Sequence, residues 1–190
     1  MLFRSIAITF LSPLFLIIAI LIKLDSKGPV FYKSRRIGWK KQFLMVCKFR
    51  SMVENADELK EELEDQSHRT DGPLFKVKDD PRITRIGKFL RRYSIDEWPQ
   101  LLNVLKGNMS LVGPRPHLPE EVNKYTDFQK RVFAVKPGIT GLAQISGRSD
   151  LPFNEEVRLD LQYIEEWSPW LDVWILWRTV FVVLKGEGAD

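Results

Sequence analysis

The longest apolar stretch of the chain lies near its start, from Ser5 to Ile22, and contains no charged residue. At about 18 residues it is at the lower limit for a bilayer-spanning helix. Pro13, near its middle, removes one helical hydrogen bond, and Ser12 can satisfy a backbone group that the proline frees. Two topologies follow: a straight spanning helix with Met1 outside, or a helix bent at Ser12-Pro13 that enters one leaflet and returns.

The segment that follows, residues 23–50, is strongly basic and contains only one acid, Asp25. The positive-inside rule places such a flank on the cytoplasmic side. Within it, apolar and β-branched residues at 30–32 and 43–49 are separated by a basic turn around Gly38. This pattern predicts a short β-hairpin.

Beyond residue 53, the apolar periodicity is mainly helical. It predicts an acidic helix over 54–65 with a solvated face, an apolar helix over 101–105, a helix over 119–135, and a helix that Asn154 can cap. The stretch 136–148 is punctuated by glycines and predicts a loop with a short strand inside it. The predicted fold class is therefore α+β and helix-rich, with one short hairpin.

Near the C-terminus, Trp170, Trp174 and Trp177 follow the i, i+4, i+7 spacing and share one helical face. Tryptophan is enriched at membrane–water interfaces, whereas a soluble core rarely requires such a stripe. The pattern favours an amphipathic helix at an interface over the alternative of a core helix.

The overall charge points to an anionic partner. The chain has 190 residues, 44% of them hydrophobic and 28% charged, with a net charge of +4, so it can form a core. Nucleic acid, a phospholipid surface and a phosphorylated substrate all remain compatible with this charge, but the apolar stretch and the tryptophan stripe disfavour nucleic acid. A single cysteine, Cys47, excludes a disulfide framework within the chain.

Asp80-Pro81 predicts a turn or a helix start, and basic residues then recur at helical spacing. If the segment is helical, these residues form a stripe on one face that leads directly to Asp96-Glu97, and we expect it to face phosphate. The residues of this stripe are Arg82, Arg85, Lys88 and Arg92.

Asp96 and Glu97 are the candidate chemical centre. Ser94-Ile95-Asp96-Glu97 fits a capping box, so a purely structural role is one interpretation. A helix N-terminus and nearby arginines lower carboxylate pKa values, so we expect both groups to be ionised at neutral pH. Ionised carboxylates are good nucleophiles and Mg²⁺ ligands but poor general acids, which favours phosphoryl transfer over glycosidase chemistry.

At these residues the chain resembles the bacterial sugar transferases, the monotopic phosphoglycosyl transferases. Each motif is weak by itself, but the ordered set is highly specific and covers nearly the whole chain. The motifs are Ser12-Pro13, Gly28-Pro29-Val30-Phe31, Arg36-Ile37-Gly38, Lys48-Phe49-Arg50-Ser51-Met52, Asp80-Pro81-Arg82-Ile83-Thr84, Ser94-Ile95-Asp96-Glu97-Trp98-Pro99-Gln100-Leu101, Gly113-Pro114-Arg115-Pro116 and Pro137-Gly138-Ile139-Thr140-Gly141.

The resemblance implies transfer of a hexose-1-phosphate from a UDP-sugar to undecaprenyl phosphate, with galactose or glucose as the expected hexose. Asp96 matches the family's nucleophile, which attacks the β-phosphate, expels UMP and holds the phospho-sugar covalently. Glu97 matches its Mg²⁺-binding partner. Arg91, Arg115 and Lys48 match phosphate-binding residues, and Asp160 matches a further polar residue of the active site.

The resemblance also implies a small monotopic membrane enzyme with interfacial amphipathic helices. It favours the re-entrant helix broken at Ser12-Pro13, and divides the chain into a membrane helix (1–25) and a membrane-associated catalytic domain (26–190) on the cytoplasmic face of the bacterial inner membrane. The lead-in before the apolar stretch is short for the family, so we expect a truncated chain or the catalytic end of a longer member. Trp98 stands where leucine is expected.

Two other functions remain open at this point, a Mg²⁺-dependent hydrolase of nucleotide-sugars and a non-catalytic scaffold for polysaccharide assembly at the same membrane. The expected partners are a UDP-sugar, undecaprenyl phosphate and a phospholipid membrane, without nucleic acid. The oligomeric state stays open.

Overall fold

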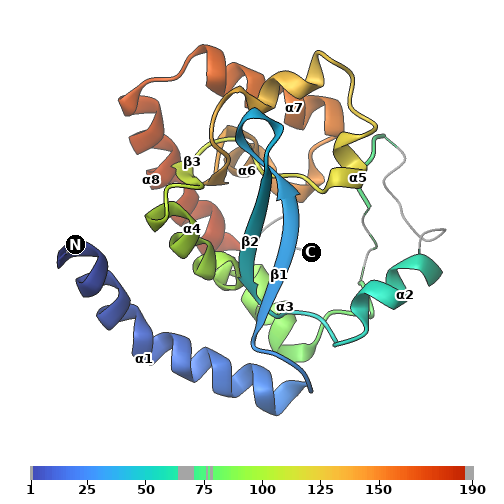
Figure 1. The fold of residues 1–190 in the computed structure, drawn as a ribbon, viewed down its shortest axis with the longest axis vertical. Coiled ribbons are helices and arrows are strands. Elements are labelled where there is room, and N and C mark those ends of the chain that lie inside the picture. The colour runs from blue at the N-terminus through green and yellow to red at the C-terminus, as the bar shows by residue number, and fades with distance from the viewer. Residues whose placement is uncertain (1, 64–70, 76, 78, 187–190) are drawn as a thin grey trace.

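A two-stranded antiparallel hairpin runs through the middle of the molecule (Figure 1). The computed structural model describes residues 2–63, 71–75, 77 and 79–186. Strand β1 (Phe31–Ile37) pairs with β2 (Phe43–Phe49) around a short 3₁₀ turn, η1 (Trp39–Lys41). The predicted hairpin is confirmed, although its first strand extends beyond residues 30–32.

Helix α1 (Leu2–Asp25) lies along the base of the hairpin (Figure 1). Its buried Ile18 and Ile22 pack in one apolar cluster with Phe49 of β2. The residues on both sides of Ser12 and Pro13 belong to one helix, because a proline removes only one hydrogen bond of the ladder. The predicted break is therefore not a gap between two helices, and a bend at this point stays a prediction. Within the part of the chain that the structure describes, no helix is both long and apolar enough to cross a membrane.

Side-chain hydrogen bonds fasten the end of α1 to the rest of the fold. Asp25 accepts a hydrogen bond from the backbone N–H of Ile86 at 2.8 Å, in the first turn of α3 (Arg85–Arg92). Arg50 donates to the carbonyl of Ser26 at 2.8 Å and to that of Lys27 at 2.5 Å. These bonds tie α1 to β2 and to the helix that leads to Asp96.

Helix α3 begins later than the sequence suggested. Thr84 caps it, its hydroxyl accepting a hydrogen bond from the N–H of Gly87 at 3.0 Å. Arg82 lies in the preceding turn, where its guanidinium folds back onto Asp80 at 2.6 Å. The stripe predicted from Arg82 onward is therefore wrong, because this ion pair takes Arg82 out of the helix.

After α3 the chain enters the 3₁₀ helix η3 (Ile95–Gln100), which continues into α4 (Leu101–Leu105). The second sheet pairs β3 (Ser110–Val112) in parallel with β4 (Gly138–Thr140), so the strand expected in the glycine-punctuated stretch is confirmed. The η3–α4 segment and the second sheet both place loops beside the hairpin.

The helix expected over 119–135 is wrong, because two short elements occupy this stretch. Helix α5 (Pro119–Val122) is followed by the 3₁₀ helix η4 (Gln129–Ala134). Thr126 and Gln129 exchange side-chain-to-backbone hydrogen bonds of 2.8 and 3.3 Å, which compete with a continuous helical ladder.

Four further helical elements follow within residues 142–186. They are α6 (Leu142–Ser146), the 3₁₀ helix η5 (Arg148–Asp150), α7 (Phe153–Glu165) and α8 (Pro169–Lys185). Val157 and Leu161 of α7 are buried in the core, as the predicted apolar face requires. The fold is thus α+β and helix-rich, as predicted.

Helix α8 buries one side and exposes the other. Ile175 is fully buried, whereas Trp170 is 78% exposed and Trp174 and Trp177 are also exposed. The alternative of a core helix is therefore wrong for the tryptophan stripe.

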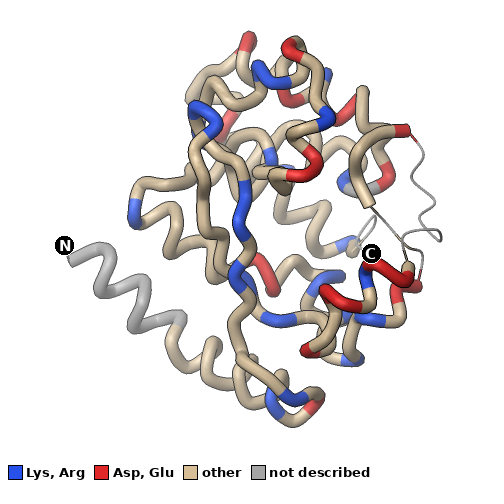
Figure 2. The backbone as a smooth tube through the Cα atoms, turned by 45° about the vertical axis from the view of Figure 1, so that its right-hand side comes forward, with Lys and Arg blue, Asp and Glu red and all other residues tan. Residues whose placement is uncertain are grey.

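Charge is distributed differently: in Figure 2, Lys and Arg follow the hairpin, and Asp and Glu gather on α2 (Ala56–Glu62).

Candidate active site

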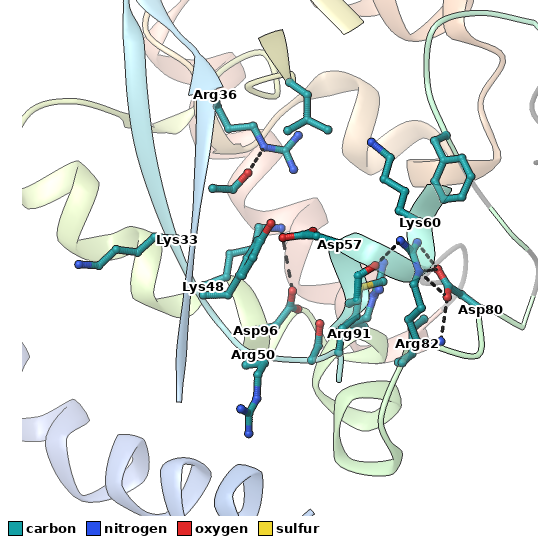
Figure 3. A pocket seen from close by; sticks show the side chains of 18 of the residues that line it. Lys33, Arg36, Lys48, Arg50, Asp57, Lys60, Asp80, Arg82, Arg91 and Asp96 are labelled. Atoms are coloured by element: carbon teal, nitrogen blue, oxygen red, sulfur yellow. Dashed lines mark hydrogen bonds and ion pairs between the residues drawn. The ribbon is translucent and has the colours of Figure 1, made fainter. Parts of the chain in front are cut away.

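The hairpin, α2 and α3 border a cavity of about 870 Å³ (Figure 3), to which the loop after β3 and helices α6 and α7 also contribute lining residues. This volume lies in the range of ligand-binding cavities. Basic side chains outnumber acidic ones in its lining, and a cavity with this excess favours an anionic ligand.

Asp96 lies in the first turn of η3, lines the cavity and is only 7% exposed. The ammonium of Lys48 lies 4.0 Å from its carboxylate, as the dashed line in Figure 3 shows. Burial raises the pKa of Asp96 to about 6, because the opposing charges of Lys48, Arg91 and Arg115 only partly offset the loss of water. The predicted lowering of this pKa is wrong, although the group is still mostly ionised at pH 7.

Glu97 behaves in the opposite way. Its carboxylate accepts a hydrogen bond from Lys48 at 2.6 Å and lies 3.9 Å from the guanidinium of Arg115. Burial raises its pKa, but the charges of Lys48 and Arg115 outweigh this and bring it to about 2. Glu97 borders a small space beside the cavity rather than the cavity itself. The predicted ionised state is supported here.

The capping box predicted at Ser94-Glu97 is wrong. Ser94 adopts a left-handed backbone conformation, with φ of 51°, and makes no side-chain cap. Its hydroxyl instead accepts a hydrogen bond from the guanidinium of Arg148 at 2.6 Å, and Glu97 is engaged by Lys48. The turn at Ser94 therefore sets the direction of Asp96 by backbone geometry, not by capping.

The three residues predicted to bind phosphate come together from distant parts of the chain. Lys48 belongs to β2, Arg91 to the last turn of α3, and Arg115 to the loop that follows β3. All three line the cavity together with Asp96. Their convergence around one carboxylate is what a phosphoryl-transfer site requires.

Asp160 is 1% exposed and does not belong to the lining of the cavity. Burial raises its pKa well above the ordinary value; the nearby charge of Glu156 adds to this, and that of Arg115 opposes it. Asp160 therefore lies behind the lining of the cavity, and its role as a further polar residue of the active site stays a prediction.

Sequence reasoning missed several cavity residues. Asp57 and Lys60 lie on the acidic helix α2, which was interpreted as a solvated face. Gln144 and Glu156 come from α6 and α7, where no pattern in the sequence distinguishes them. Arg36 and Arg148 also belong here; the motif Arg36-Ile37-Gly38 was the available signal for the first of these.

The exposed residues of the predicted basic stripe are outside the cavity. Arg85, Lys88 and Arg92 are exposed on α3 and are not part of the lining. Arg91, one residue before Arg92, is the α3 side chain that reaches the cavity. The charge that α3 contributes to the cavity thus comes from one position of this helix, not from a stripe.

The donor set is compatible with Mg²⁺. Among the described residues, no group of three or more His, Cys, Asp or Glu side chains is placed to hold a metal. Mg²⁺ commonly takes only one or two protein carboxylates and completes its octahedron with substrate phosphates and water. The adjacent Asp96 and Glu97 supply such a pair.

Comparison with known proteins agrees with this chemistry. The family model described as "Bacterial sugar transferase" matches residues 1–186. Over 163 residues, 85% of the chain, it is 52% identical to "Galactosyl transferase CpsE" of Streptococcus agalactiae serotype III and covers 36% of that protein.

Two further relatives have names that specify both a sugar and a lipid carrier. The chain is 46% identical, over 85% of its length, to the "Undecaprenyl-phosphate galactose phosphotransferase" of Salmonella typhimurium, and covers 35% of it. It is 44% identical, over 90% of its length, to the "Undecaprenyl-phosphate glucose phosphotransferase" of Komagataeibacter xylinus, and covers 32%. The chain thus spans about a third of the length of each of these three relatives.

Proposed function

The chain belongs to the bacterial sugar transferase family, and on that premise we propose that it transfers a hexose-1-phosphate from a UDP-sugar to undecaprenyl phosphate. The names of the galactose and glucose phosphotransferases among its relatives support this substrate pair. The single observation that carries the proposal is the buried carboxylate of Asp96 in a cavity whose lining includes Lys48, Arg91 and Arg115.

In the first half-reaction, a carboxylate oxygen of Asp96 forms a bond to the β-phosphorus of the donor. The bond from that phosphorus to the bridging oxygen breaks, and UMP leaves with the electron pair. Arg91, Arg115 and Lys48 neutralise the phosphate oxygens as charge shifts toward the leaving group. The product is an aspartyl phospho-sugar, and no proton has to be transferred in this step.

In the second half-reaction, a phosphate oxygen of undecaprenyl phosphate attacks the same phosphorus. The bond to Asp96 breaks, the carboxylate is regenerated and the lipid diphosphate hexose is released. When bound, Mg²⁺ would be held by Glu97, with Asp96, and would withdraw charge from phosphate oxygens. Because the two half-reactions use one nucleophile in turn, ping-pong kinetics are expected.

The raised pKa of Asp96 suits a nucleophile. A carboxylate with a pKa of about 6 is more basic than an ordinary aspartate and is still mostly ionised at neutral pH. Glu97, with a pKa of about 2, remains charged throughout the physiological range. The two adjacent acids are therefore suited to different tasks: attack by Asp96 and charge-based binding by Glu97.

We further propose that α1 and α8 associate with the cytoplasmic face of the bacterial inner membrane. Residues 1–25 would form a re-entrant membrane helix bent near Pro13, and residues 26–190 the catalytic domain. Large apolar side chains on the outer sides of both helices are exposed. Examples are Leu16, Ile17 and Leu24 of α1 and Trp170, Trp177 and Leu184 of α8.

The reaction can be tested with UDP-galactose or UDP-glucose labelled in the hexose, Mg²⁺ and undecaprenyl phosphate. We expect labelled lipid product and an equal amount of UMP. Release of sugar phosphate without lipid product would identify a hydrolase instead, and complete lack of turnover by well-folded protein would favour a scaffold.

The re-entrant topology can be tested with a cysteine at position 2 in a Cys47→Ser background. Membrane-impermeant maleimide should label it only in inside-out vesicles, because both ends of a re-entrant helix lie on the cytoplasmic side. Labelling only from the outside would rule out the re-entrant form.

A further inference from the structure

Gln144 has a polar side chain without a partner at the wall of the cavity. It lies in α6 and lines the cavity. Its amide nitrogen and amide oxygen are both buried, and neither makes a hydrogen bond within the described residues. A buried amide without partners costs free energy, since it gives up its hydrogen bonds to water. A molecule bound in the cavity could complete the hydrogen bonds of this amide.

Glu156 supplies a second polar group to the same cavity. It lies in α7, is only 8% exposed and lines the cavity. Helices α6 and α7 pack against each other through Ala143, Ile145 and Leu159. Arg115, the guanidinium that is expected to hold phosphate, lines the same cavity. Burial lowers the pKa of Arg115, but the negative charge of Glu97, and to a smaller extent that of Glu156, raises it above its ordinary value.

The chemistry of these two groups matches a sugar better than a nucleobase. A hexose is neutral and presents hydroxyl groups that both donate and accept hydrogen bonds, which a carboxamide and a carboxylate can satisfy. A nucleobase is usually held by stacking on aromatic side chains. The tyrosine and phenylalanine side chains of the lining come from the hairpin and from position 75, not from α6 or α7; they are Phe31, Tyr32, Phe49 and Phe75.

We propose that Gln144 and Glu156 form the hexose subsite, in which Gln144 binds the sugar hydroxyls and determines hexose specificity. This inference rests on the proposed function. The hexose is bonded directly to the β-phosphate, so its subsite must adjoin the group that holds that phosphate. Gln144 and Glu156 meet this condition because they line the same cavity as Arg115. The uridine then extends toward the aromatic residues of the hairpin.

The test is a binding measurement in the Asp96→Asn background, in which the donor is not consumed. Calorimetry in detergent or nanodiscs would compare UDP-glucose, UDP-galactose and UMP before and after Gln144→Leu. We expect the preferred UDP-hexose to bind about tenfold more weakly after the change, the effect of one lost neutral hydrogen bond or slightly more. UMP, which lacks the hexose, should change by less than about twofold.

Two further variants separate recognition from structure. Gln162→Leu is the matched control, because Gln162 lies on α7 outside the cavity lining and its amide contacts Glu166; it should alter no affinity. Gln144→Leu should not lower the melting temperature, since leucine removes an unsatisfied buried amide. Gln144→Glu keeps the size and one of the two hydrogen-bonding capacities and should shift the ratio between the two hexoses.

Three results would overturn the inference. Equal weakening of UMP and UDP-hexose would assign Gln144 to the nucleotide. Unchanged binding of all ligands would show that the amide of Gln144 recognises none of them. A large fall in melting temperature with general loss of affinity would indicate a structural role. Failure of the Asp96→Asn protein itself to bind UMP or either UDP-hexose would instead overturn the proposed function, and with it this inference.

Discussion

The cavity and the outer surface of α1 and α8 depart from the usual arrangement of a soluble domain in opposite directions. In the cavity, charged groups are withdrawn from water: Asp96 is 7% exposed, and Arg82 and Glu156 are also buried. On the outer surface, apolar groups face outward, with Leu24 80% exposed and Trp170 78% exposed. Buried charges and extended exposed apolar patches each indicate a binding function.

The two regions also differ in how their side chains are held. Cavity residues are held by named partners, such as Lys48 on Glu97 and Arg148 on Ser94, at 2.6 Å in each case. The exposed tryptophans of α8 are held in position mainly by the backbone of their own helix. We therefore expect substitutions in the cavity to change the transfer reaction but hardly to change membrane association. Substitutions on the outer surface should do the reverse.

Asp96→Asn tests the cavity and should have the largest effect on transfer. The amide cannot act as the nucleophile, so transfer should fall by roughly 10⁴-fold or more, as with other removed nucleophiles. Formation of labelled lipid product from UDP-hexose measures it. Co-sedimentation with vesicles should be unchanged, and a variant with normal turnover would show that the nucleophile has been assigned to the wrong residue.

Removal of Mg²⁺ should have the next largest effect. Chelation should reduce the rate by more than about 100-fold, because a bound cation supplies several kcal/mol of charge stabilisation. Added Mg²⁺ should restore it, while K⁺ at equal ionic strength should not. Full activity in excess chelator would argue against Glu97 as a metal-binding residue and would leave the Lys48–Glu97 pair as a structural contact.

The double change Trp170→Glu and Trp177→Glu tests the outer surface. Two charges on an apolar helical face should weaken membrane association of the protein by about tenfold, measured as the fraction released from vesicles by alkaline carbonate. Arg158→Glu serves as the control, because Arg158 is exposed on α7, whose outer side is polar. Retention of the double variant equal to that of the control would contradict a membrane role for α8.

Lys48→Met is the most specific test, and its readout is a small shift in pH dependence. The rate itself should also fall, because Lys48 is expected to neutralise phosphate oxygens. Asp96 reacts as the carboxylate, so kcat/KM should fall as the pH decreases through its pKa of about 6. The charge of Lys48 lowers that pKa, so its removal raises it. The acidic limb of the pH profile should therefore move upward by about one pH unit. A limb that stays in place would mean that another group controls it.

Local patterns predicted most of the elements, but not their ends. The strand over 43–49, the buried face of Val157 and Leu161, and the aromatic face of α8 follow from periodicity, which depends only on neighbours in the chain. The start of α3 was misplaced because Arg82 pairs with Asp80. The predicted helix over 119–135 was too long, because the side chains of Thr126 and Gln129 each accept a hydrogen bond from the other's backbone N–H.

The kind of chemistry can be inferred from residue types and their spacing: an acidic pair, a basic chain and apolar segments. Which basic residues reach the pair depends on how distant segments pack, because Lys48, Arg91 and Arg115 lie on separate elements. The same packing decides that Asp96 and Glu97, neighbours in sequence, have pKa values displaced in opposite directions. Residue type and spacing specify which charges exist, whereas burial and the distances between charges, which set a pKa, arise only when distant segments pack together.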